Sequence, residues 1–118
     1  MEPLQATLCP KFHHAVELIG RRWAGAIIQL LTGGRLRYAA LKGGIPAITD
    51  RMLSERLKEL EAEGIVRRIV TPETPVRVEY ELTKKGRDLE AALAAIGRWA
   101  TTWVTPSQAK PARGRRSA

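Results

Sequence analysis

A helix that leads directly into two short strands is the feature that most constrains the fold of this chain. Residues 49–63 place apolar side chains at helical spacing, after Thr49, a residue type that caps helix starts, and before the helix-ending Gly64. Two segments with the alternation of β-strands follow, 65–70 and 76–82, joined by a loop with two prolines. This order predicts a winged helix, whose helix and ribbon can grip neighbouring grooves of a duplex.

The helical segment 49–63 has two different sides. Its apolar residues, which we expect to be buried, are Met52, Leu53, Leu57 and Leu60. The same spacing turns outward Asp50, Arg51, Ser54, Glu55 and Lys58. Asp50 lies in the first turn, where its charge complements the helix dipole. We assign Asp50 that role rather than a DNA contact, because phosphates repel a carboxylate.

Three further helices are expected elsewhere. Pro10 favours the start of a helix over residues 10–20, because its missing N–H would have no partner there. A second helix is expected over 22–32, and a last long helix over 84–104 after the capping residue Thr83. The apolar residues of the last helix step by four and three, as in a coiled-coil seam. Between them we expect a short strand at 36–38 and one or two helical turns at 38–42.

The chain has 118 residues, which suits one domain, and its hydrophobic share of 44% is that of a normal globular core. We expect a flexible N-terminal arm at 1–8, a folded domain at 9–104 and a disordered basic tail at 105–118. The fold class is α+β, mainly helical: a winged helix-turn-helix with a two-stranded wing and a C-terminal dimerisation helix.

Positive charge is spread over the whole chain. The net charge is +8, and the tail contributes half of it through Lys110, Arg113, Arg115 and Arg116. Both the tail and the folded part therefore favour a polyanionic partner such as nucleic acid. A solubilising surface charge is the alternative interpretation, and the tail is either disordered or an accessory DNA arm.

Several other classes of protein are disfavoured. No apolar run approaches the roughly 20 residues of a membrane span, and the N-terminus lacks a signal-peptide pattern. The single cysteine, Cys9, suits a reducing cytoplasm. With His13 and His14 it supplies too few ligands for a structural metal. Since we find no phosphate-binding glycine loop and no nucleophile–base pair, we expect neither an enzyme nor a cofactor.

The chain resembles the HxlR-type helix-turn-helix regulators, which are related to the MarR-type regulators. The resemblance covers about residues 9–103 and rests on separated segments in the same order: Cys9-Pro10, residues 18–23, residues 51–64, and residues 72–86 with Thr83 and Gly86. Two features depart from the family pattern: Glu55 stands where glutamine is common, and the basic tail lies outside it. The resemblance implies a winged helix, a homodimer and transcriptional control at an operator.

Candidate DNA contacts lie on the helix and the ribbon. Arginine can bind guanine through two hydrogen bonds and glutamate can accept from cytosine, so the outward face of the helix can read bases. Near the ribbon tip Arg77 is our choice for a phosphate or minor-groove contact, with Arg67 and Arg68 weaker, and Arg37 is a plausible backbone clamp. The alternative is an ordinary solvated surface. The full set is Arg37, Thr49, Arg51, Ser54, Glu55, Lys58, Arg67 and Arg77.

The first and last helices carry more large apolar residues than a small core needs. Aromatic residues are enriched in interface cores, so we expect a two-fold dimer. The alternative is that these residues cover the monomer's own core. The candidate interface residues are Phe12, Val16, Leu89, Leu93, Ile96, Trp99, Ala100 and Trp103.

Cys9 is a candidate sensor. It stands before Pro10 at a helix N-terminus, where the dipole stabilises a thiolate. The family resemblance implies the same role, because several such regulators sense oxidants or electrophiles through a cysteine at this place. An inert buried thiol is the alternative.

These observations together predict a sequence-specific DNA-binding regulator. Repression is favoured over activation, because a bound dimer needs only to occlude a promoter. Two other functions stay open: a winged helix that binds proteins instead of DNA, and a non-specific architectural DNA-binding protein. DNA, a second copy of the chain and a small-molecule or oxidant effector are the expected partners.

Overall fold

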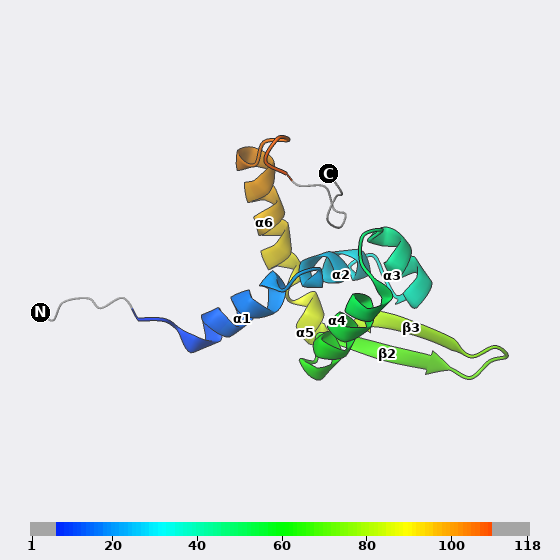
Figure 1. Ribbon diagram of the computed structural model, residues 1–118. Coiled ribbons are helices and arrows are strands. Elements are labelled where there is room, and N and C mark those ends of the chain that lie inside the picture. The colour runs from blue at the N-terminus through cyan, green and yellow to red at the C-terminus, as the bar shows by residue number, and fades with distance from the viewer. Residues whose placement is uncertain (1–6, 110–118) are drawn as a thin grey trace, which may run out of the picture.

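The computed structural model describes residues 7–109, and Figure 1 shows a central body from which three parts project. The first helix, the last helix and the wing ribbon each extend away from this body in a different direction. In chain order the elements are α1 Pro10–Gly20, α2 Ala24–Leu31, β1 Leu36–Arg37, α3 Tyr38–Gly44, α4 Asp50–Ala62, β2 Val66–Thr71, β3 Arg77–Leu82, α5 Lys84–Arg87 and α6 Glu90–Trp103.

The three strands form one antiparallel sheet in the order β1-β3-β2. Val66 pairs with Leu82 and Thr71 with Arg77, so β2 and β3 form the predicted hairpin, and Leu36 pairs with Tyr80. Because cross-strand partners lie on the same face, Tyr80 and Leu82 face the helices while Arg77, Glu79 and Glu81 face away. The winged-helix prediction is therefore confirmed.

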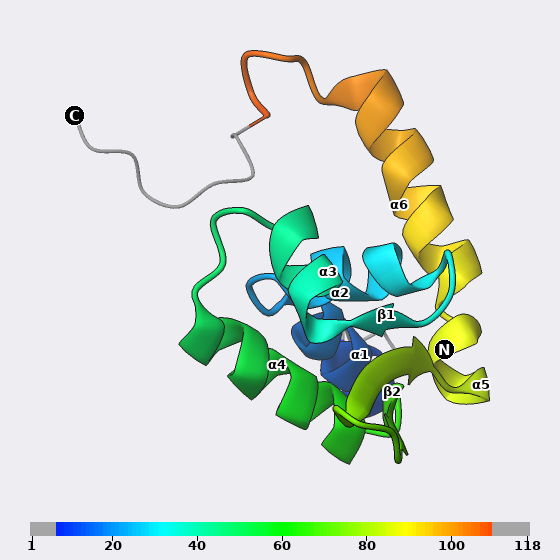
Figure 2. The same cartoon turned by 90° about the vertical axis from the view of Figure 1, so that its right-hand side faces the viewer.

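The core lies between α2, α3, α4 and the inner face of the sheet. Leu53, Leu57 and Leu60 of α4 are almost completely buried there, as their spacing predicted, whereas Met52 is only half-buried. A Cβ atom on Gly44 would lie only 2.8 Å from Leu30 Cδ1, so glycine lets the end of α3 approach α2 closely. This packing sets the position of α3 relative to α2, and Figure 2 shows both helices together with α4.

The second helix begins at Ala24 and not at Arg22 as predicted. Trp23 has a left-handed backbone conformation (φ 75°), which a continuing α-helix does not allow. Its ring still packs against the core, and the Arg22 guanidinium lies 5.0 Å from the ring centre. The helical spacing of Trp23 had suggested a helical position, but tertiary packing decides its conformation.

The last long helix is interrupted, which corrects the expected single helix over 84–104. It divides into α5 and α6, and Figure 1 shows that the two differ in direction. At the break the Leu89 N–H donates to the Gly86 carbonyl at 3.0 Å, three residues back instead of four. Gly86 packs directly on the Ile65 backbone, so the chain turns there before α6 leaves the body.

The predicted ends of the chain lie partly outside the described residues. Residues 1–6 of the expected arm and 110–118 of the expected tail belong to that part. The described part of the tail, 105–109, forms a turn in which the Gln108 N–H donates to the Thr105 carbonyl at 2.9 Å. Among the described residues no helix is both long and apolar enough to cross a membrane.

Candidate DNA-binding surface and its connection to the first helix

The turn between α3 and α4 is held by side chains at the start of α4. The Thr49 hydroxyl oxygen accepts from the Met52 N–H at 3.1 Å, which is the predicted N-cap. The Tyr38 hydroxyl donates to Asp50 Oδ1 at 2.9 Å and lies 3.2 Å from the Asp50 carbonyl oxygen. The first residue of α3 therefore binds the first residue of α4, and this bond ties the two helices of the helix-turn-helix together.

The outward face of α4 carries the predicted polar residues. Arg51, Ser54, Glu55 and Lys58 are all exposed, and the Arg51 side chain retains 89% of its accessible surface. Arg51 Nε donates to Glu55 Oε2 at 3.2 Å, one helical turn away. The pair orients the guanidinium without burying it, and a base or phosphate can still approach.

The outer face of the sheet holds a small ion-pair network centred on Glu81. Arg67 of β2 binds Glu81 from one side, and Arg35, just before β1, approaches it from the other at 3.2 Å. Arg35 also lies 3.7 Å from Glu79. The bond from Arg67 is the main reason that the pKa of the Glu81 carboxyl is lowered. Arg67 is thus partly neutralised within the wing, and sequence analysis did not identify Arg35.

Arg77 of the wing and Arg37 of β1 have less complete partners, and Arg68 of β2 is exposed opposite Tyr80, on the other face of the sheet. Arg77 lies 3.5 Å from Glu73 in the loop, and its Nε, although buried, has no hydrogen-bond partner among the described residues. Arg37 is exposed on β1, opposite Glu79 of β3. Arg37 and Arg77 therefore lie on the same outer face of the sheet as the Glu81 network.

Large apolar residues are exposed on α1 and α6. Trp99 retains 61% and Trp103 67% of its accessible surface, and Phe12, Val16 and Ile96 are also exposed. Leu89 and Leu93 differ from them, because both pack partly against the core of their own chain, and Ala100 is half-buried. In α1 no residue is buried. The predicted interface residues thus divide into an exposed group and a group that serves the monomer.

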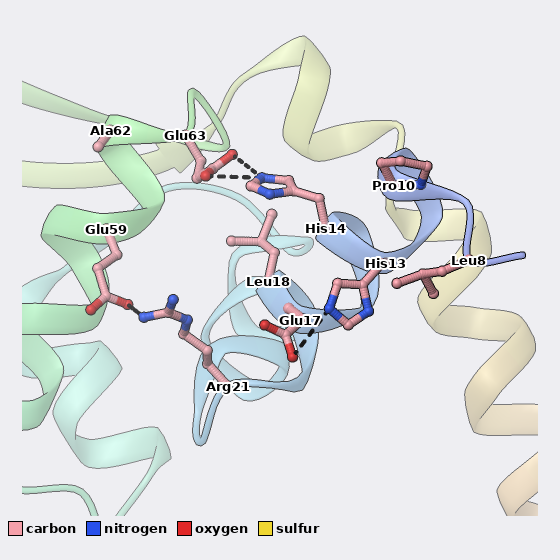
Figure 3. Close-up of a pocket in the computed structure, with 10 residues that line it drawn as sticks. All are labelled: Leu8, Pro10, His13, His14, Glu17, Leu18, Arg21, Glu59, Ala62 and Glu63. Atoms are coloured by element: carbon pink, nitrogen blue, oxygen red, sulfur yellow. Dashed lines mark hydrogen bonds and ion pairs between the residues drawn. The ribbon is translucent and has the colours of Figure 1, made fainter.

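A pocket of about 530 Å³ lies between α1 and the C-terminal end of α4 (Figure 3). Two polar contacts join these helices at its edges: a hydrogen bond between His14 Nε2 and Glu63 at 3.1 Å, and an ion pair between Arg21 and Glu59 at 3.3 Å. Leu18 lies between the two pairs in Figure 3. A displacement of α1 would therefore act on the end of α4 through side chains.

Cys9 is the N-cap residue of α1 and is exposed to solvent. Its carbonyl accepts from the His13 N–H at 2.9 Å, and no side chain among residues 7–109 caps this helix start. The alternative interpretation, a buried thiol, is thus wrong. Among residues 7–109 no three His, Cys, Asp or Glu side chains are grouped to hold a metal ion.

A helix-turn-helix with an exposed polar recognition face, followed by an arginine-bearing β-hairpin, defines a winged-helix DNA-binding transcription regulator. Comparison with known proteins refines this class. The model of the HxlR-like helix-turn-helix family matches residues 18–108, so the chain belongs to that family. The relatives are transcription regulators rather than enzymes, which confirms the expectation from sequence.

Three relatives indicate how close the similarity is. The HTH-type transcriptional regulator YvaP of Bacillus subtilis is 48% identical over 103 residues, covering 87% of this chain and 95% of YvaP. The reduced form of YodB from B. subtilis is 46% identical with a TM-score of 0.77, over 85% of this chain and 98% of YodB. The redox regulator HypR in its oxidised form is 37% identical with a TM-score of 0.74, over 80% and 96%.

YodB has also been solved in other chemical states. The diamide-treated form is 46% identical with a TM-score of 0.72, over 86% of this chain and 100% of that chain. A quinone-bound form is 42% identical with the same TM-score, over 81% and 100%. Redox-responsive regulators are thus among the relatives of this chain.

Proposed function

We propose that this chain represses transcription as a homodimer that binds a near-palindromic operator. The observation that carries the proposal is the outward face of α4, where Arg51 is almost fully exposed yet oriented by Glu55. A recognition helix enters the major groove with such a face, and its N-terminal half meets the base edges. Repression needs only that the bound dimer occlude a promoter.

The contacts divide into base reading and backbone positioning. Arg51 is proposed to bind guanine, and Ser54, Glu55 and Lys58 to lie along the same groove. Thr49, Arg37 and Arg77 are proposed to contact the DNA backbone or the minor groove. Arg67 is the weakest candidate, because it would have to exchange Glu81 for a phosphate.

The dimer is supported by the exposed group Phe12, Val16, Ile96, Trp99 and Trp103. Side chains of this size rarely stay exposed together on a monomer, and aromatic residues are enriched in interface cores. A two-fold axis through α1 and α6 presents two copies of α4 to successive turns of one face of the duplex.

Selection of bound fragments from a random DNA pool tests the function. We expect a near-palindromic site that the protein binds more tightly than random DNA at the same salt concentration. Arg51→Ala should weaken binding to that site by about 1–3 kcal/mol. Lys84→Ala is the matched control, because Lys84 on α5 is also 89% exposed, and it should leave the affinity nearly unchanged.

Two outcomes would favour other functions. Equal binding to the selected site and to random DNA indicates an architectural protein, because non-specific binding comes from phosphate contacts. Absence of binding even at low salt indicates a winged helix that binds a protein instead of DNA.

We also propose that Cys9 senses oxidants or electrophiles. Its exposure and the redox states in which YodB and HypR have been solved support this role. The pairs His14–Glu63 and Arg21–Glu59 provide a route from α1 to α4. With one cysteine per chain, diamide would take two electrons and two protons from two thiols and leave one disulfide between two subunits.

The sensor proposal is tested by operator affinity before and after diamide treatment. We expect the treated wild-type protein to lose affinity, a reducing agent to restore it, and Cys9→Ser to be insensitive. If diamide modifies Cys9 without changing operator affinity, Cys9 is not a sensor.

A further inference from the structure

Tyr38 and Asp50 form a contact that the DNA-binding residues above do not include. The Tyr38 hydroxyl donates to Asp50 Oδ1 at 2.9 Å, from the first turn of α3 to the first turn of α4. α4 does not need the contact to begin, because Thr49 already caps it. The Tyr38–Asp50 bond is therefore a second interaction beside the Thr49 cap, and it lies where the helix-turn-helix faces solvent.

The two residues differ in how firmly they are held. The Tyr38 ring is half-buried and packs against the core, so its hydroxyl has a fixed position. The pKa of Tyr38 is raised, first because burial disfavours the phenolate and also because of Asp50. The phenol keeps its proton at neutral pH and acts as the donor, whereas Asp50 is exposed.

An exposed carboxylate on this surface requires an explanation. Asp50 stands beside Arg51 at the N-terminal end of α4, the part that meets base edges, and it has no ion-pair partner among the described residues. From the sequence, Asp50 was expected to stabilise the helix dipole and not to contact DNA, because a mobile carboxylate would repel phosphates. The Tyr38 bond revises that expectation, because it holds the Asp50 carboxylate in one position. The bond from Tyr38 restricts it: Oδ1 is occupied, and Oδ2 has no hydrogen bond among the described residues.

We propose that Tyr38 and Asp50 form a unit that determines base specificity. Tyr38 is a positioning residue, and Asp50 Oδ2 accepts a hydrogen bond from the exocyclic amino group of a cytosine or an adenine in the major groove. These amino groups are the donors that the major groove presents, and guanine and thymine offer acceptors at the corresponding positions. The inference rests on the proposed function, in which α4 lies in the major groove.

Random-pool selection with matched variants tests the proposal. Asp50→Ala removes the acceptor. Asp88→Ala is its control, because it removes another exposed carboxylate, at the junction of α5 and α6. Tyr38→Phe removes only the hydroxyl, and Tyr80→Phe does the same for a buried tyrosine whose hydroxyl makes no hydrogen bond among the described residues. Thermal unfolding of each variant is measured in parallel.

We expect the wild-type protein to enrich cytosine or adenine at a position next to the guanine assigned to Arg51. Asp50→Ala should lose this preference by about fivefold or more, and the other positions should be kept. Tyr38→Phe should weaken the preference at the same position, and both controls should select the wild-type site.

A purely structural clamp between α3 and α4 gives a different result. It would lower the unfolding temperature of Tyr38→Phe and Asp50→Ala while both variants still select the wild-type bases, and that result overturns the inference. If the wild-type protein enriches no site at all, the proposed function fails and the inference fails with it. The two failures are thus distinguishable.

Discussion

At the scale of single residues, Gly86 is the described glycine at which an added side chain would meet its neighbour most closely. A Cβ atom added to it would lie 2.3 Å from the Ile65 carbonyl oxygen, which also accepts from the Thr83 N–H. Backbone atoms cannot move aside as a flexible side chain can. The chain after β3 can therefore pass under Ile65 only if residue 86 has no side chain.

Gly86→Ala should accordingly lower the free energy of unfolding by about 1–3 kcal/mol, the range for an overpacked site. Gly20→Ala is the control, because a Cβ atom there meets nothing within 4 Å. Urea denaturation followed by circular dichroism measures both. Equal stability of the two variants would contradict the close approach of Gly86 to Ile65.

Sequence spacing predicted the Thr49 cap and the outward face of α4, but not the pair between Arg51 and Glu55. Thr49 and the outward face of α4 follow from helical periodicity, and the pair Arg51–Glu55 is one turn apart. The contacts Tyr38–Asp50 and Arg35–Glu81 could not be predicted in this way. They join different elements, and their geometry exists only once α3, α4 and the sheet have packed.

At the scale of elements, a contact between distant parts of the chain also explains why the interrupted last helix was not predicted. The apolar residues from Leu89 to Trp103 have regular helical spacing, and nothing in their pattern signals a break. The break occurs where Gly86 contacts Ile65, a residue distant in sequence. By contrast, α4 and the β-hairpin were predicted nearly to their ends, because their caps and alternation are local signals.

The Glu81 carboxylate of the wing should make the stability of the fold depend on pH in the acid range. Its folded-state pKa is lowered below the ordinary value of 4.5, mainly by the bond from Arg67. The carboxylate thus contributes stability that is present above the unfolded-state pKa and is lost as pH falls through the folded-state pKa. Removing Arg67 should return the pKa toward 4.5.

Titration of the Glu81 side-chain carboxyl by nuclear magnetic resonance tests this. Arg67→Ala should raise its pKa, whereas Arg68→Ala should not, because Arg68 pairs with Tyr80 on the opposite face of the ribbon. Identical titration curves for the two variants would show that Arg67 does not hold Glu81 in solution.

At the scale of the whole molecule, α1 and α6 project from a body whose core is already complete. The buried core comes from α2, α3, α4, the sheet and the segments beside them, and neither α1 nor α6 contains a buried residue. We therefore expect Trp99→Ala and Trp103→Ala to leave monomer stability almost unchanged. Each should raise the dimer dissociation constant about 30-fold or more, as buried interface aromatics do.

Light scattering at micromolar concentration measures this directly. Val70→Ala and Val76→Ala are suitable controls, because both valines are exposed apolar residues on the wing, away from α6. The wild-type protein and the controls should have the mass of a dimer, and the tryptophan variants should shift toward a monomer. A wild-type monomer would contradict the proposed assembly.

The proposed dimer also constrains the spacing of its operator. Two recognition helices related by a two-fold axis reach half-sites about 34 Å apart, roughly one turn of DNA. Insertion of about five base pairs between the half-sites rotates one of them to the opposite side of the duplex. A rigid dimer can then hold only one half-site, so the affinity should fall toward that of a single half-site. Gel-shift titration of the native, lengthened and single half-site fragments separates this outcome from the alternative. If the lengthened fragment binds as tightly as the native one, the two copies of α4 do not act as one rigid unit.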